Sequence, residues 1–177
     1  MRKEIRLAGT GGQGLILAGV ILAEAAGVYE DRKVIQTQSY GPEARGGASK
    51  TDVIISDQEI LYPKARQVDI LACLSQKSCD AFLKDLKKDG IVINDTFYVR
   101  SCVAKNCHTL PLSEMTRKRF GREIFMNIVL LGALAELTKI VTVDSLKKAL
   151  RGQVPPATLE NNLQALELGA LIVKGEA

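Results

Sequence analysis

Glycines near the start of the chain have the spacing of a phosphate-binding turn. Gly9, Gly11 and Gly14 follow a short apolar run, and Gly12 and Gln13 complete the segment before a long apolar stretch begins. In dinucleotide-binding proteins such glycines let the backbone approach a pyrophosphate, and the next helix offers amide groups and positive potential at its N-terminus. The turn is therefore a candidate anion site.

The polar partners that a nucleotide needs are missing from their expected positions. A carboxylate for the ribose should end the second strand, where residues 36–38 read Gln-Thr-Gln. A phosphate loop would need Lys and Ser or Thr directly after the last glycine, where the chain has Leu15 and Ile16. Two interpretations stay open: the turn binds an anion or another protein, or it only packs a helix on a sheet.

A second loop, at residues 39–47, combines one aromatic, one acidic and one basic side chain with Gly and Pro. The guanidinium of Arg45 is a planar fork suited to a carboxylate or a phosphate. Loops of this kind carry function more often than packing, although a surface pair between Glu43 and Arg45 would also explain the charges. The candidate contact residues here are Tyr40, Glu43, Arg45, Gly46 and Gly47.

Other residues that could do chemistry form no recognisable set. His108 is the single histidine, and the four cysteines show no Cys-x-x-Cys spacing. Cys102 and Cys107 beside His108 could be half of a metal site, but a second ligand pair is missing. The sequence therefore predicts no catalytic residue, no metal ligand and no cofactor bound by this chain, and it predicts reduced thiols.

The elements that must position these loops alternate between strands and helices. This order predicts a Rossmann-like α/β fold, a mostly parallel sheet with helices on both faces and further helices at the C-terminus, as one domain over residues 1–177. The predicted strands are 5–8, 34–38, 50–56, 68–74, 90–94 and 107–110, and the predicted helices are 15–28, 76–88, 122–138, 142–150 and 156–170.

Composition narrows the function classes. The net charge of +4 is spread without a basic run, which argues against a nucleic-acid or membrane surface. We find no signal peptide, and the apolar stretch 15–28 is too short to span a bilayer and contains Glu24. We therefore expect a cytoplasmic protein.

Two predicted helices, 15–28 and 124–137, are apolar on nearly every side. Such a helix must be covered all round. Either the two helices pack on each other, or they are buried against another polypeptide. On the second interpretation the isolated chain would expose an apolar patch and self-associate, most simply as a homodimer.

Three segments together resemble one protein family. The turn at residues 9–14, the loop QSYGPEARGG at 38–47, and Asn127 followed by Leu-Gly-Ala at 131–133 are similar to the gamma subunit of 2-oxoacid:ferredoxin oxidoreductases. The loop and the strand at 50–56 after it are most similar to the 2-oxoglutarate branch. The resemblance covers essentially the whole chain and adds Asn127 to the candidate contact residues.

The resemblance implies a non-redox subunit of a larger enzyme that is inactive alone. That enzyme would convert a 2-oxoacid and coenzyme A to acyl-CoA and CO2 and reduce ferredoxin. Thiamine diphosphate and iron–sulfur clusters would lie in the full complex, with alpha and beta subunits as partners and a delta subunit as a further candidate. The alternative is a stand-alone Rossmann-like protein that binds a nucleotide or another anion.

Overall fold

The computed structural model describes residues 1–39 and 48–177. The strands are β1 (Arg2–Thr10), β2 (Lys33–Ser39), β3 (Ala48–Ser56), β4 (Val68–Cys73), β5 (Leu86–Asp95) and β6 (Cys107–Leu110). The helices are α1 (Leu15–Val28), α2 (Gln76–Phe82), α3 (Leu112–Phe120), α4 (Met126–Thr138), α5 (Val143–Gln153) and α6 (Pro156–Lys174), with a 3₁₀ turn at Leu83–Asp85. In this part of the chain, no helix is long and apolar enough to cross a membrane.

The strands described form one sheet in the order β2-β3-β1-β4-β5-β6. Strands β1, β4, β5 and β6 are parallel neighbours, whereas β3 is antiparallel to both β1 and β2. The predicted Rossmann-like, mostly parallel sheet is confirmed. The insertion of β3 between β1 and β2 was not predicted, and it moves the end of β2 away from the glycine turn.

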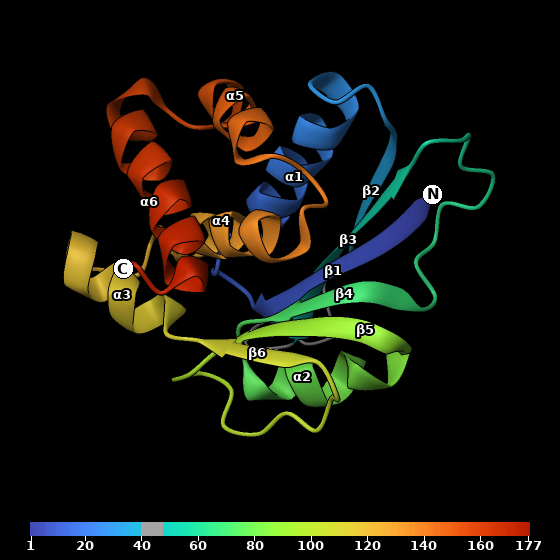
Figure 1. Ribbon diagram of the computed structural model, residues 1–177, viewed down its shortest axis with the longest axis horizontal. Coiled ribbons are helices and arrows are strands. Elements are labelled where there is room, and N and C mark those ends of the chain that lie inside the picture. The colour runs from blue at the N-terminus through green and yellow to red at the C-terminus, as the bar shows by residue number, and fades with distance from the viewer. Residues whose placement is uncertain (40–47) are drawn as a thin grey trace.

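Helices cover both faces of the sheet, as predicted, but unequally (Figure 1). Helix α2 lies on one face, against β1, β3 and β4. Helices α1, α4, α5 and α6 gather on the other face, where α1 lies on β1, β2 and β3. The larger apolar core lies between these four helices and the sheet.

Helix α4 is enclosed by other parts of the same chain. Its residues 126–135 are buried, and it packs chiefly on α6, with α1, α3 and α5 also in contact. The two main helices cross at glycines: a Cβ atom on Gly132 would lie 1.9 Å from the Leu166 carbonyl oxygen, and one on Gly169 would lie 1.9 Å from that of Val129. Close backbone contact of this kind tolerates no larger residue.

The two apolar helices therefore pack within the chain. Among the described residues of 15–28 and 124–137, the large apolar side chains that stay exposed are Val28 and Ile124, at opposite ends. The predicted apolar patch over these helices is wrong, because α6 and α5 supply the cover that a sheet alone could not. Self-association stays a prediction and loses this support.

One helix boundary was also predicted wrongly, and one helix was missed. The helix expected over 76–88 ends at Phe82, because Leu86 already pairs with Val68 of β4 and starts a longer β5. Helix α3 was not predicted at all. Ser113 lies in the first turn of α3, where its N–H and hydroxyl groups donate to the buried Asp95 carboxylate at 2.7 and 2.9 Å.

Candidate functional site

The glycine turn lies at the carboxyl end of β1, at the edge where ligands bind in open α/β sheets. Gly12 and Gly14 have φ angles of 91° and 71°, in the left-handed region that favours glycine. Gly14 also precedes the first turn of α1, and no described side chain caps this helix N-terminus. Gly11, Gly12 and Gly14 are exposed. The turn therefore presents uncapped backbone amide groups at a surface.

The side chain of Gln13 braces this turn from within. Its Oε1 accepts a hydrogen bond from the Thr10 N–H at 2.8 Å, and its Nε2 donates to the Leu74 carbonyl at 2.9 Å. The amide thus joins the ends of the neighbouring strands β1 and β4. It lies so close over Gly9 that a Cβ atom there would be 2.2 Å from Oε1. Gln13 holds the turn in place and leaves no room for a side chain at Gly9.

Asn127 of α4 also holds the turn. It lies in the first turn of α4, is 4% exposed, and its Nδ2 donates to the Gly14 carbonyl at 3.0 Å. A Cβ atom on Gly14 would lie 2.6 Å from this nitrogen. The structure thus brings Asn127 of α4 against the turn that contains Gln13 and Gly14. A role for any of them in binding stays a prediction.

The second predicted loop lies outside the described residues, but the residues on either side of it do not. Ala48 pairs with Thr10 and Ser49 with Gly9, and the Ser49 hydroxyl donates to the Gly9 carbonyl at 3.4 Å. The candidate residues Tyr40, Glu43, Arg45, Gly46 and Gly47 are not described, so their contacts stay predictions. The chain enters β3 directly beside the glycine turn.

The strand order places the end of β2 too far from the glycine turn for a ribose-binding carboxylate. The missing ribose carboxylate was sought at the end of β2, but β3 separates β2 from β1. Gln36, which stands near that place, donates from Nε2 to Thr51 Oγ1 of β3 at 2.7 Å. An acidic residue there would sit two strands away from the glycine turn. A dinucleotide site of the usual geometry is therefore disfavoured by the topology as well as by the residue types.

A buried ion network under α2 was missed by the sequence analysis. Arg6 of β1 is 1% exposed and binds both oxygens of Asp52 on β3 at 2.6 and 2.9 Å, and its Nη1 also donates to Asp85. Burial opposes the charge on Arg6, but Asp52 and Asp85 outweigh it, and its pKa is raised. The ring of Phe82 lies 5.1 Å from the guanidinium. This network holds the 3₁₀ turn at Leu83–Asp85 and the end of α2 against the sheet. The alternation of Ile5, Arg6 and Leu7 was its sequence signal.

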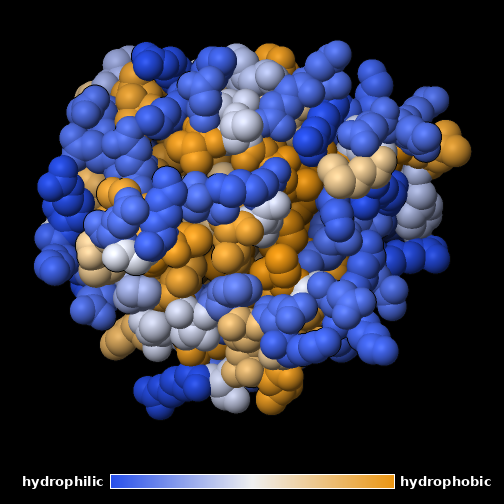
Figure 2. Space-filling view, in the orientation of Figure 1, coloured by the Kyte–Doolittle hydropathy of each residue, from blue (hydrophilic) through white to orange (hydrophobic). Residues whose placement is uncertain are grey.

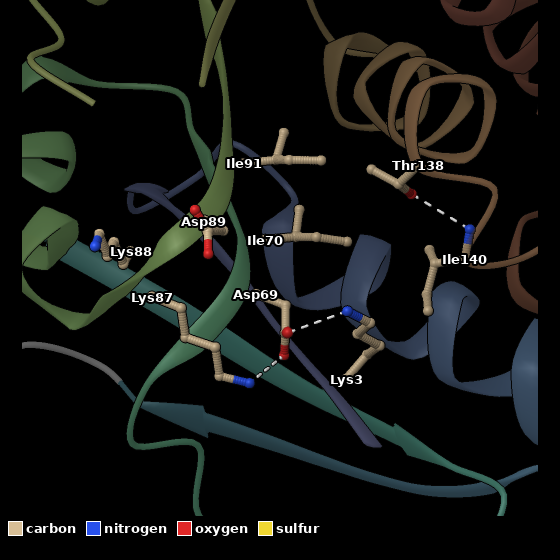
Figure 3. A pocket seen from close by; sticks show the side chains of 10 residues that line it. Lys3, Asp69, Ile70, Lys87, Lys88, Asp89, Ile91, Thr138 and Ile140 are labelled. Atoms are coloured by element: carbon tan, nitrogen blue, oxygen red, sulfur yellow. Dashed lines mark hydrogen bonds and ion pairs between the residues drawn. The ribbon is translucent and has the colours of Figure 1, made fainter. Parts of the chain in front are cut away.

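A cavity of about 440 Å³ lies at the opposite, amino-terminal edge of the sheet (Figure 3). Ile70, Ile91 and Ile140 supply its apolar lining, and apolar side chains gather between the C-terminal helices and the sheet in the space-filling view (Figure 2). Its polar centre is Asp69, which accepts from Lys87 Nζ at 2.8 Å and from Lys3 Nζ at 3.3 Å.

The charges in this cavity largely cancel. Burial tends to raise the pKa of Asp69, but hydrogen bonds from Lys87, the Glu4 N–H and Lys3 outweigh burial, and the pKa is lowered. Both lysines are thereby engaged by one carboxylate. The described lining contains no histidine or cysteine that could serve as nucleophile or base. Across the described ranges, no group of three or more His, Cys, Asp and Glu is placed to hold a metal ion.

Comparison with known families defines the class of protein. Residues 4–172 match the family described as pyruvate ferredoxin/flavodoxin oxidoreductase, and the chain belongs to this family. The predicted resemblance is confirmed.

Within this family, the chain is similar to subunits of 2-oxoglutarate synthase and to a gamma subunit of known structure. The chain is 47% identical over 178 residues to 2-oxoglutarate synthase subunit KorC of Methanocaldococcus jannaschii, covering 98% of this chain and 95% of that protein. It is 44% identical to the KorC subunit of Methanothermobacter thermautotrophicus, covering 99% and 97%. A crystal structure of the gamma subunit of a keto/oxoacid ferredoxin oxidoreductase from Geobacter sulfurreducens superposes with a TM-score of 0.89, at 42% identity over 99% and 98% of the two chains.

Proposed function

We propose that this chain is the gamma subunit of a 2-oxoglutarate:ferredoxin oxidoreductase, an enzyme that forms succinyl-CoA and CO2 and reduces ferredoxin. The observation that carries the proposal is the 47% identity to a 2-oxoglutarate synthase subunit along nearly the full length of both chains. The 33% identity to a pyruvate synthase subunit from Methanothermobacter marburgensis is lower, which favours 2-oxoglutarate among the 2-oxoacids.

The geometry supports a subunit that completes a site. The glycine turn offers amide groups at the start of α1, and neutral amides from Gln13 and Asn127 hold it rigid. Such an edge suits an anionic group or the backbone of a neighbouring subunit. We propose that residues 40–47 contribute to the same surface, with Arg45 binding a carboxylate or phosphate of substrate, coenzyme A or partner.

The redox chemistry belongs to other subunits in this proposal. Thiamine diphosphate would lie in the alpha and beta subunits, and iron–sulfur clusters would lie elsewhere in the full complex, with a delta subunit as a further candidate partner. Ferredoxin would meet the complex and not this chain. The complex would work in the cytoplasm, and the whole chain would act as a single unit.

Reconstitution tests the proposal. The alpha and beta subunits of the same organism, expressed with and without this chain, should reduce a viologen dye with 2-oxoglutarate and coenzyme A only when the chain is present. Pyruvate and 2-oxoisovalerate are the matched substrates and should give at least tenfold lower kcat/KM. Arg45→Ala in the same assay should raise the KM for one substrate and leave the complex assembled.

The alternative has its own readout. A stand-alone nucleotide-binding protein would bind NAD(P)H, which fluorescence titration of the purified chain detects directly. Saturable binding of NAD(P)H, or an unchanged dye reduction rate when this chain is omitted, would overturn the proposed function.

A further inference from the structure

The cavity at the amino-terminal edge of the sheet combines a charged end with an apolar wall (Figure 3). Its volume of about 440 Å³ is that of a small-molecule site. Lys3 lines the cavity at the start of β1, whereas the glycine turn lies at the other end of the same strand. The cavity therefore lies apart from the surface that the proposed function uses.

Three adjacent strands supply the charged end. Lys3 of β1 and Lys87 of β5 donate to separate oxygens of Asp69 on β4, at 3.3 and 2.8 Å. The Asp69 carboxylate also accepts from the Glu4 N–H at 2.9 Å, and its side chain is 14% exposed. Two ammonium groups thus surround one mostly buried carboxylate, and this end of the cavity carries an excess of positive charge.

Two further charged residues leave this excess in place. Lys88 and Asp89 also line the cavity, and they carry opposite charges. Figure 3 shows the Lys88 side chain extended away from Asp69 and Ile140. Asp89 is exposed, so water and salt screen its charge. The lysine pair around Asp69 therefore dominates the electrostatics of the cavity.

The lysine pair keeps hydrogen-bond capacity for a ligand. An ammonium group has three N–H donors, and each of these lysines donates once within the part of the chain that the structure describes. Asp69, in contrast, already accepts three hydrogen bonds and has little capacity left for a cationic group. Both the charge and the unused donors favour an anion.

Isoleucines from two strands and a loop form the apolar wall. Ile70 of β4 pairs with Ile91 of β5, and Ile140 follows α4. The pairing register of the two strands shifts between Val68 and Ile70. Because successive residues of a regular strand point to opposite faces, this shift accounts for Asp69 and Ile70 lining one cavity. The charged end and the apolar wall are thereby joined.

We propose that this cavity binds a small aliphatic carboxylate. The ligand carboxylate accepts hydrogen bonds from Lys3 and Lys87 beside Asp69, and its hydrocarbon body packs on the isoleucine wall and displaces water. Asp69 shares the ammonium groups with the ligand and so weakens its binding. Removing the Asp69 charge should therefore strengthen ligand binding, although it destabilises the fold.

An NMR titration of the full-length chain at pH 7 tests the site, with 4-methylpentanoate as the probe. Saturable shifts of the methyl signals of Ile70, Ile91 and Ile140 are expected. Acetate keeps the charge without the hydrocarbon body, and 4-methylpentanamide keeps the body without the charge. Each should bind at least about threefold more weakly, because an ion pair at a partly exposed site and a few buried methylene groups each contribute at least this much.

Three variants separate the roles of the charges. Lys87→Gln should weaken binding of 4-methylpentanoate at least about threefold, because one ammonium donor is lost. Lys88→Gln is the matched control: it removes the same charge from the next residue, whose side chain points away, and should leave the affinity unchanged. Asp69→Asn should tighten binding about threefold, since both ammonium groups are released to the ligand.

Several results would overturn the proposal. Absence of saturable binding of 4-methylpentanoate, or equal affinity for the acid and the amide, excludes a carboxylate site. Equal losses in Lys87→Gln and Lys88→Gln, or weaker binding to folded Asp69→Asn, exclude the assigned lysine pair. Tighter binding of 3-methylbutylamine than of 4-methylpentanoate would identify a cation site instead.

Discussion

The two edges of the sheet, at the carboxyl and amino ends of its parallel strands, differ in how tightly their side chains are packed. At the carboxyl-terminal edge, the glycine turn is held by neutral amides, Gln13 and Asn127, at distances that leave no space for a Cβ atom at Gly9 or Gly14. At the amino-terminal edge, Lys3 and Lys87 reach across an open cavity to Asp69, and each lysine side chain is 40% exposed. The positive φ of Gly14 and its close contact with Asn127 make the first edge intolerant of a Cβ atom there, whereas long half-exposed side chains can adjust at the second.

We expect the largest loss of unfolding free energy from Gly14→Ala. The new Cβ atom would meet Asn127 and would be held at a positive φ, so we expect a loss of about 1–3 kcal/mol in unfolding free energy. Denaturant unfolding measures this loss.

Two further variants separate packing from backbone strain. Gly12→Ala has the same kind of φ angle, and no described atom lies within 4 Å of its Cβ position, so it should cost less. Asn127→Ala combined with Gly14→Ala should cost less than the sum of the single changes, because the first removes the clash of the second. Equal losses for Gly12→Ala and Gly14→Ala would show that the packing of Asn127 contributes nothing.

A smaller effect is expected when the brace itself is removed. Gln13→Ala deletes the two hydrogen bonds that join the ends of β1 and β4, and we expect a loss of about 1–2 kcal/mol. Gln164→Ala on α6 is the matched control, because its hydrogen bonds are exposed, and it should stay within about 0.5 kcal/mol. In the reconstituted enzyme, Gln13→Ala should lower activity by more than Gln164→Ala. Equal effects of the two changes on both stability and activity would contradict the inference that Gln13 holds the glycine turn in place.

The smallest effect is expected at the opposite edge. Asp69→Asn leaves two lysines without their carboxylate, and because these are half-exposed we expect a loss of about 1 kcal/mol at pH 7. The pKa of Asp69 is lowered in the folded chain, so its contribution is present above the unfolded pKa of about 3.9 and is lost as pH falls through the lower folded value. The difference in unfolding free energy between the two proteins should therefore shrink from pH 7 to pH 3.

Asp89 lines the same cavity but is exposed, so Asp89→Asn is the matched control for Asp69→Asn. It should alter the unfolding free energy by less than about 0.5 kcal/mol at either pH. A difference for Asp69→Asn that grows as the pH falls would contradict the assigned direction of the pKa shift.

Local patterns in the sequence were sufficient to predict the elements around the glycine turn. An apolar run, glycines at short spacing and an apolar stretch of helical length predicted β1, the turn and α1, because each signal lies within a few residues. The alternation of strands and helices along the chain was sufficient to predict a mostly parallel sheet. Family resemblance pointed to residues 9–14 and Asn127, which the structure brings together across 113 positions of sequence.

Tertiary structure decided what local signals leave open. Residues 83–88 were predicted as the end of a helix, but pairing of Leu86 with Val68 draws them into a turn and a strand. The sequence determined by itself which segments are apolar, where the chain must turn, and to which family it belongs. The strand inserted between β1 and β2 and the cover over α4 were decided by the tertiary structure, because strand neighbours and helix contacts depend on packing between residues far apart in the chain.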